Sequence, residues 1–150
     1  MNREILFRGK RCSDGKWVYG FYVESKQSWQ GHKPHRSWIV PNAISNGGFF
    51  NILGRYAVKD DTVGQFTGMT DKHGLKVFEG DIVEVYDFTS AYASKYRGVV
   101  KMYCCSWCVE YEDSILDMVA HPRLFFDDFA DRKTEVIGNI HDHSELLSTK

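Results

Sequence analysis

The chain has 150 residues, the size of one ordinary domain, and folding at this length buries about 68–70% of the unfolded chain's surface. With 43% hydrophobic and 26% charged residues, the composition excludes an intrinsically disordered chain and a membrane-embedded one. Nineteen basic and 20 acidic residues give a formal charge of −1, without the basic surplus that is usual for proteins that bind nucleic-acid phosphates. A local basic patch remains compatible with this total.

The sequence also lacks targeting and membrane signals. Residues 1–4 do not begin the apolar stretch of a secretory signal, and no apolar run approaches the roughly 20 residues of a membrane-spanning helix. We therefore expect a cytoplasmic protein whose four cysteines are reduced.

Short extended segments separated by turn residues run through the whole chain. In chain order, strands are predicted at 5–10, 17–23, 38–41, 63–66, 75–78, 82–86, 97–102, 107–111 and 134–140. Polar loops are predicted at 24–36, 42–48 and 87–95. Gly20, in the middle of the strongest strand, indicates a bulge or a close approach of another backbone. The pattern predicts an all-β fold, a small barrel or sandwich of short antiparallel strands, in a single domain of residues 1–150.

Two tight turns are predicted in the middle of the chain. Asp71 can accept a hydrogen bond from the backbone two residues on, and Gly74 supplies the positive φ that a short hairpin loop needs. In Glu79-Gly80-Asp81, the aspartate can likewise accept backbone N–H groups while Gly80 takes positive φ.

The motif Gln65-Phe66-Thr67-Gly68 precedes these turns. Phe66 is predicted to lie in the core, with Gln65 and Thr67 on the opposite face of the strand. These two side chains either satisfy buried backbone groups or line a pocket, and the pattern leaves both readings open.

The C-terminal third is less regular. Residues 112–118 are predicted as a short helix or a connection, and the acidic and aromatic run 125–131 as a helical turn or a partner-facing segment. Residues 144–147 are predicted as a closing helical turn with Ser144 as its N-cap.

Several of these motifs occur together, in the same order, in one known family. The chain carries Q-F-T-G at 65–68, Asp71, Gly74, E-G-D-I-V at 79–83, E-V-I-G-N-I at 135–140 and E-L-L at 145–147. With its opening at residues 3–10 and 15–20, it resembles the YopX family over essentially its whole length. The resemblance implies a mostly β protein that is encoded by a phage, prophage or other mobile element of a bacterial host. It implies no established activity.

Cysteines and histidines give only weak metal-binding signals. Cys105 and Cys108 have the C-x-x-C spacing with which a turn presents two thiolates to zinc. No second cysteine pair completes such a site, and reduced cysteines also act as small apolar residues on a hairpin. His141 and His143 would share a face on a strand, but a solvated loop is the favoured reading. We therefore predict no metal ligand and no cofactor.

One aromatic segment has basic residues close to it in the sequence. A stacking platform for single-stranded nucleic acid could be formed by Trp17, Tyr19, Phe21 and Tyr22 with Arg8, Lys10 and Arg11. Packing of aromatic strands into a β core explains the same residues, and the lack of net positive charge favours this second reading.

The sequence assigns no catalytic residue and leaves the binding residues open. The favoured reading is a non-catalytic binding or assembly protein that associates with itself and has no membrane partner. The first alternative is a nucleic-acid-binding β-barrel with its lysines and arginines on one face. The second is an enzyme with a pocket around Gln65, Thr67, Glu79 or Asp81, in which the paired carboxylates would do acid–base work.

Overall fold

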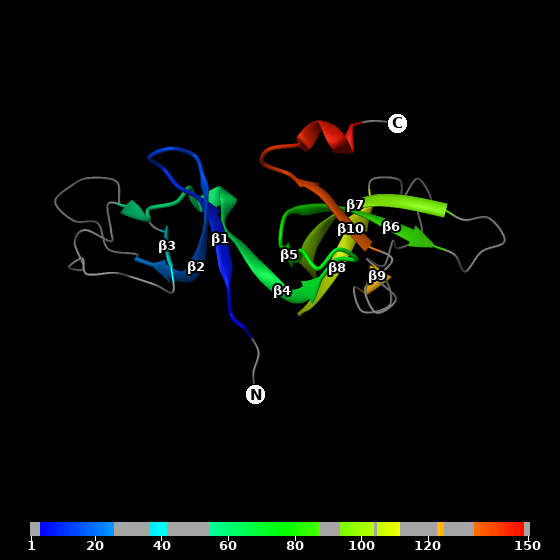
Figure 1. The fold of residues 1–150 in the computed structure, drawn as a ribbon, viewed down its shortest axis with the longest axis horizontal. Coiled ribbons are helices and arrows are strands. Elements are labelled where there is room, and N and C mark those ends of the chain that lie inside the picture. The colour runs from blue at the N-terminus through cyan, green and yellow to red at the C-terminus, as the bar shows by residue number, and fades with distance from the viewer. Residues whose placement is uncertain are drawn as a thin grey trace. The chain divides into compact units, whose positions relative to one another are not determined.

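The computed structural model describes residues 4–25, 37–41, 55–87, 94–103, 105–111, 123–124 and 134–148 (Figure 1). Within these ranges the chain forms short antiparallel strands and two 3-10 helices, η1 (Asp60–Thr62) and η2 (Ser144–Leu147). The predicted all-β class is confirmed. No helix in this part of the chain is long and apolar enough to cross a membrane.

The described strands form two five-stranded sheets. The first has the order β3-β2-β1-β4-β5, with β1 (Phe7–Lys10), β2 (Trp17–Glu24), β3 (Ser37–Val40), β4 (Gly64–Thr70) and β5 (Lys76–Phe78). The second has the order β10-β6-β7-β8-β9, with β6 (Asp81–Asp87), β7 (Ser94–Tyr103), β8 (Ser106–Tyr111), β9 (Arg123–Leu124) and β10 (Thr134–Asn139). The chain divides into two compact units, an N-terminal unit, Met1–Phe66, and a C-terminal unit, Thr67–Lys150. The single domain expected from the sequence stays a prediction.

In the N-terminal unit, the strand pairings form a closed circuit. β1 pairs with β2, and β2 pairs with β3. Ala57 pairs with Trp38 of β3. Val58 then pairs with Arg11, just beyond β1, which returns the circuit to its start. A Cβ on Gly9 would lie 3.1 Å from the buried Val58 side chain, so glycine in β1 makes room for the residue that closes the circuit.

β2 and β3 approach each other closely at Gly20. A Cβ at this position would lie 2.0 Å from the carbonyl oxygen of Val40, so the predicted close approach of another backbone is confirmed. On the same side of β2, the hydroxyl of Tyr22 lies 3.2 Å from that of Ser37, and its ring lies 5.4 Å from that of Phe7. This side of β2 therefore packs against neighbouring residues of the unit.

In the C-terminal unit, β6, β7 and β8 form an antiparallel meander, to which β10 adds beside β6. Alternate residues of these strands point to one side, and the apolar ones bury their side chains together. The core cluster consists of Val83, Val85, Val100, Trp107 and Val109 from these strands together with Val77 of β5. The pairing of β10 with β6 shifts between Val136 and Gly138, where a bulge interrupts the register.

The loop predicted at 87–95 is shorter than expected. β7 begins at Ser94, which pairs with Asp87, and Lys95 pairs with Tyr86. The polar residues of this segment thus extend the β6–β7 hairpin, because they find cross-strand partners.

Ser144 is not the N-cap of the closing helical turn. η2 begins at Ser144 itself, and the preceding His143 makes no capping hydrogen bond through its side chain. The turn before η2 is instead organised by Asn139, whose side-chain oxygen accepts the N–H of His141 and that of Asp142, each at 3.0 Å. The predicted segments 42–48, 112–118 and 125–131 and most of the loop 24–36 lie outside the described residues.

Candidate functional site

One side of β2 presents aromatic side chains to solvent. Tyr19 is 48% exposed and Phe21 is 53% exposed, so the prediction that they pack in a core is wrong. The other side of the strand, which carries Gly20 and Tyr22, is the one that packs inward. Residues opposite each other on β1 and β2 point to the same side of the sheet, and so do alternate residues of one strand. We call this surface the aromatic face and define it by the residues that reach solvent, Lys10, Trp17, Tyr19, Phe21 and Val23. Arg8, which pairs with Tyr19, is on the same side but buried.

Two basic side chains of β1 lie over the ring of Trp17. The Cζ atom of Arg8 is 4.7 Å and the Nζ atom of Lys10 is 5.6 Å from the ring centroid, within the range of cation–π attraction. Arg8 is buried, whereas Lys10 is half-buried and reaches the surface. Arg11 is engaged elsewhere, because its Nε and Nη2 atoms donate to Asp14 at 2.9 and 2.5 Å. This guanidinium holds the pKa of Asp14 below its usual value.

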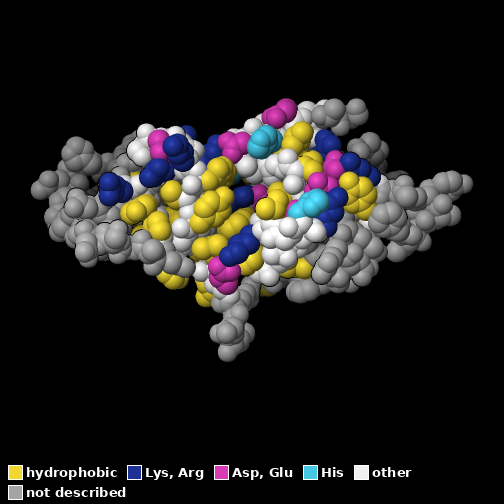
Figure 2. Space-filling view, viewed as in Figure 1, with side chains coloured by type: hydrophobic (Ala, Val, Ile, Leu, Met, Phe, Trp, Pro, Cys, Tyr) yellow, Lys and Arg dark blue, Asp and Glu magenta, His cyan; other side chains and the backbone are white. Residues whose placement is uncertain are grey.

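The near-neutral total charge conceals a large difference between the two units. The N-terminal unit has ten Lys and Arg residues against five Asp and Glu, a formal charge of +5. The C-terminal unit has nine against fifteen, a formal charge of −6, and the two sum to the −1 of the whole chain. Figure 2 shows hydrophobic side chains reaching the surface beside Lys and Arg over the N-terminal unit. The aromatic face therefore belongs to the basic part of the chain.

The predicted turn at Asp71 is confirmed. The side chain of Asp71 is buried, and its Oδ1 atom accepts hydrogen bonds from the N–H groups of His73 at 2.8 Å and Leu75 at 2.9 Å. Gly74 has φ +82°, a conformation that glycine adopts without strain. The carboxylate thus supplies the acceptor that shapes the β4–β5 connection.

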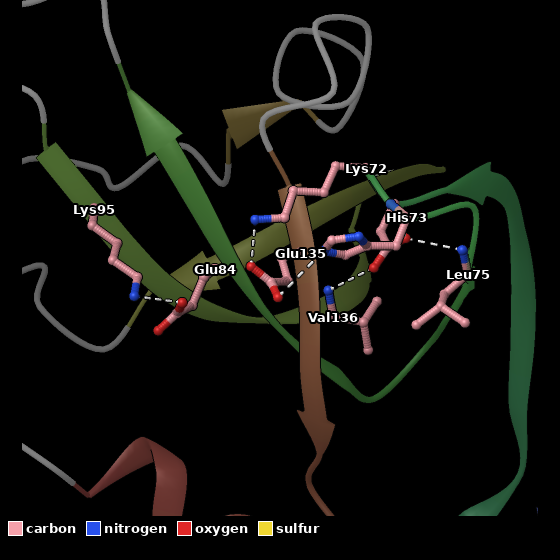
Figure 3. A network of polar contacts seen from close by, with 8 residues as sticks. Lys72, His73, Leu75, Glu84, Lys95, Glu135 and Val136 are labelled. Atoms are coloured by element: carbon pink, nitrogen blue, oxygen red, sulfur yellow. Dashed lines mark hydrogen bonds and ion pairs between the residues drawn. The ribbon is translucent and has the colours of Figure 1, made fainter.

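The same carboxylate fastens this turn to β10. The Oδ2 atom of Asp71 accepts the N–H of Val136 at 3.2 Å, 65 residues further along the chain. The N–H of Lys72 donates to the carbonyl of Thr134 at 3.0 Å. Figure 3 shows Val136 of β10 beside His73 and Leu75 of the turn. Asp71 therefore acts as a clamp within the C-terminal unit.

The residues of the Q-F-T-G motif take different roles. Phe66 is buried, as predicted. Thr67 is also buried, and its hydroxyl donates to the carbonyl of Val77 at 2.9 Å and accepts the N–H of Met69 at 3.2 Å. Two interpretations of Thr67 were left open, and the one in which its side chain hydrogen-bonds backbone groups is confirmed. Gln65 is half-buried on β4.

The Glu79-Gly80-Asp81 turn has the predicted geometry. Gly80 has φ +78°, and its carbonyl accepts the N–H of Ile140 at 2.9 Å. Asp81 is 1% exposed, and its Oδ2 atom accepts the N–H of Phe78 at 2.8 Å. Glu79 is half-buried beside it. The turn reading of Asp81 is confirmed by this hydrogen bond.

The histidines near the C-terminus lie beyond the last strand. His141 is in the turn after β10, and His143 follows it in an exposed position. Asn139 holds this turn through the hydrogen bonds described above and also donates to Asp142 at 3.1 Å. Among the residues that the structure describes, no three His, Cys, Asp or Glu side chains are grouped so that they could hold a metal ion.

A buried glutamate of β6, Glu84, contacts Lys95 of β7 (Figure 3) and, through Arg97 of β7, is connected to η2. Glu84 is 6% exposed, its Oε2 lies 2.6 Å from Lys95 Nζ, and its Oε1 accepts from Arg97 at 2.9 Å. Arg97 also donates to the carbonyl of Leu146 at 2.6 Å. Burial alone would raise the pKa of Glu84, but hydrogen bonds with Lys95 and Arg97 outweigh it and hold the pKa below its usual value. Sequence reasoning missed this group, although a charged residue inside the apolar run 82–86 was a signal for it.

Neighbouring charges of the C-terminal unit are also paired. Lys72 Nζ lies 2.5 Å from Glu135 Oε2, and His73 Nε2 lies 3.5 Å from Glu135 Oε1 (Figure 3). The hydrogen bond from Lys72 holds the pKa of Glu135 below its usual value. Lys72 and Lys95 also lie 5.0 and 5.5 Å from the ring centroid of Tyr86. These carboxylates and cations therefore hold strands and turns together.

The two cysteines of the C-x-x-C sequence lie in different environments. Cys108 is 2% exposed, and its thiol lies 3.3 Å from the carbonyl oxygen of Lys101, so it packs as the predicted small residue. Cys105 is exposed in the turn between β7 and β8, with φ +63°. The apolar interpretation thus holds for Cys108 and not for Cys105.

Comparison with known proteins gives one family and a similar structure. The family model described as YopX protein matches residues 6–148. No curated protein matches the chain. The crystal structure of protein EF1440 from Enterococcus faecalis is similar, with a TM-score of 0.50 and 21% sequence identity over 96% of this chain and 98% of that chain. At this identity, the similarity shows the fold alone.

Proposed function

This chain belongs to the YopX family, and we propose that it is a non-catalytic accessory protein of a phage or other mobile element, which acts by binding and self-assembly. Its place of action is the cytoplasm of the bacterial host. Its copies associate through the opposite charges of their two units.

The hydrogen bonds that the motif carboxylates Asp71 and Asp81 accept support a non-catalytic role. A catalytic acid or base needs an oxygen that can reach a substrate proton. Asp71 instead receives three backbone N–H groups on its two oxygens, and Asp81 receives the N–H of Phe78 while almost wholly buried. Both residues do what a turn requires of them.

The observation that carries self-assembly is the charge difference, +5 against −6. A chain near neutrality as a whole has little net repulsion between copies, while its oppositely charged parts attract. The N-terminal unit of one copy therefore attracts the C-terminal unit of the next. Such a head-to-tail contact produces a ring if the rotation closes and a filament if it does not.

Sedimentation velocity of the full chain at two salt concentrations tests this proposal. The Debye length falls from about 10 Å at 0.1 M salt to about 3 Å at 1 M, which weakens attraction between exposed charges. We expect oligomers at the lower concentration and monomers at the higher one. Monomers under both conditions would refute self-assembly. An oligomer of the same size at both salt concentrations would refute the electrostatic origin of self-assembly.

A matched pair of charge reversals sharpens the test. Lys16 in the N-terminal unit and Lys76 in the C-terminal unit are both exposed. Lys16→Glu lowers the positive charge of the basic unit and should shift the equilibrium toward monomer. Lys76→Glu makes the acidic unit more negative and should leave the oligomer at least as stable. Equal weakening by both variants would contradict the head-to-tail arrangement.

A further inference from the structure

The aromatic face combines exposed aromatic rings with positive charge, and the fold requires neither of them. Tyr19 and Phe21 each leave about half of a large side chain in water, although apolar rings of this size are usually covered. As alternate residues of β2, they lie on the same side, about 6.6–6.8 Å apart along the strand. Two exposed rings in a row offer separate stacking surfaces for successive planar groups.

Positive charge lies on the same side of the sheet as these rings, because Arg8 pairs with Tyr19 and Lys10 with Trp17. Lys10 lies on the same side of the sheet, opposite Trp17, with its Nζ atom 5.6 Å from the indole ring. The unit that carries the face has a formal charge of +5. A ligand that fits both features has flat aromatic groups joined by anionic ones.

We propose that the aromatic face binds single-stranded nucleic acid, with bases stacked on Tyr19 and Phe21 and phosphates beside Lys10. In a duplex, the faces of the bases are already stacked on each other, so only an unpaired strand can offer them to a protein. An acidic protein surface would match the positive charge of the unit, but two exposed rings in a row along one strand are the arrangement that successive bases of an unpaired strand occupy. The inference goes beyond self-assembly and depends only on the binding role proposed above.

Fluorescence anisotropy with labelled oligo(dT) of about 16 nucleotides tests the proposal, because single-strand sites on small β domains span about 4–16 nucleotides. The full chain should bind the oligonucleotide more tightly than a duplex of the same length. Tyr19→Ala or Phe21→Ala should weaken binding about 5- to 150-fold, the equivalent of the 1–3 kcal/mol that stacking of one base contributes. Phe21→Trp keeps a ring at this position and should retain binding.

Tyr103 provides a matched control. It is an exposed tyrosine, 58% accessible against 48% for Tyr19, but it lies on β7 in the acidic unit. Tyr103→Ala should therefore leave binding of oligo(dT) unchanged. Equal losses in Tyr19→Ala and Tyr103→Ala would overturn the assignment of the site.

Salt dependence tests the phosphate contact separately. Each neutralised phosphate of a single strand contributes about 0.7 to the slope of log affinity against log salt. Lys10→Gln should reduce this slope by about that amount, and Lys76→Gln in the acidic unit should not change it. An unchanged slope for Lys10→Gln would remove Lys10 from the site.

Two further measurements separate the possible occupants. Heparin carries negative charge without bases, so Tyr19→Ala should leave its binding intact. Equal weakening for heparin and oligo(dT) would overturn stacking. If Phe21→Ala sediments as a monomer under conditions in which the unaltered chain is an oligomer, and oligo(dT) does not bind, the face contacts a second copy of the chain. The inference is then wrong. If oligo(dT) binds while the chain stays monomeric at every salt concentration, self-assembly fails and this inference stands.

Discussion

Replacing Asp71 with alanine removes a side chain that holds both its own turn and the strand beside it. The carboxylate accepts hydrogen bonds from three N–H groups, those of His73, Leu75 and Val136. His73 and Leu75 are exposed, so water can replace the lost acceptor at these two positions. Val136 is half-buried on β10, where its N–H is left without that acceptor.

The expected decrease in the free energy of unfolding follows from the environments of these three N–H groups. Each of the two turn hydrogen bonds contributes about 0.5–1 kcal/mol net, because water competes for the same donors. The bond to Val136 contributes about 1–2 kcal/mol, because a half-buried donor is poorly rehydrated. Asp71→Ala should therefore lower the free energy of unfolding by about 3 kcal/mol, a large share of the 5–15 kcal/mol typical of a domain. Asp71→Asn keeps one acceptor oxygen and should lose about half as much.

Urea denaturation at neutral pH, followed by circular dichroism, measures these differences. Asp14→Ala is the control, because Asp14 is an exposed aspartate that also accepts a backbone N–H in a turn, that of Lys16 at 3.2 Å. It should lose clearly less than Asp71→Ala. Hydrogen exchange of the Val136 amide should also become faster in Asp71→Ala. A change of less than about 0.5 kcal/mol, or an unaltered exchange rate at Val136, would refute the clamp.

Two other changes test the energetics of the fold. Glu84→Gln should lower the free energy of unfolding by about 1–2 kcal/mol at pH 7, less than for a fully buried ion pair because Lys95 and Arg97 are partly exposed. Since the folded-state pKa of Glu84 lies below its unfolded value, this stabilisation is present above the unfolded pKa, near 4.5, and is lost as the pH falls through the folded pKa. Urea denaturation between pH 7 and pH 3 should show the difference between the two proteins shrinking, and a constant difference would contradict the ion pair. Gly20→Ala should cost at least about 3 kcal/mol, because its Cβ would meet a backbone atom, the Val40 carbonyl oxygen, at 2.0 Å. A thermal melt that matches the unaltered protein would show that β2 and β3 are not so close.

Much of the local structure could be predicted from residue types. Trp17–Glu24 and Asp81–Asp87 form strands where β-branched and aromatic residues are concentrated. The turns at Asp71 and Gly80 form as predicted, because aspartate acceptors and positive-φ glycines act within a few residues of themselves. Interactions between residues this close together in the chain can be predicted from the residue types alone.

The candidate site could be predicted only in part. Alternation along β2 implies that Tyr19 and Phe21 share one side of the strand, but it does not say which side meets solvent. That depends on the approach of Gly20 to Val40, and the strand pattern indicated a close approach at Gly20 without naming the backbone that makes it. The basic character of the site was present in the sequence, but it becomes visible only when the charges are counted separately for each unit.

The closed circuit of the N-terminal unit has a consequence for the order of folding. Arg11 and Val58 pair across 47 positions of the chain, whereas β6, β7 and β8 each pair with the next strand in the sequence. Closing a long loop costs chain entropy before its contacts return free energy, so non-local pairings form slowly. We expect the β6–β8 hairpins to form early in refolding and the N-terminal circuit to close late. On the ribosome, that circuit has to wait until Val58 has emerged.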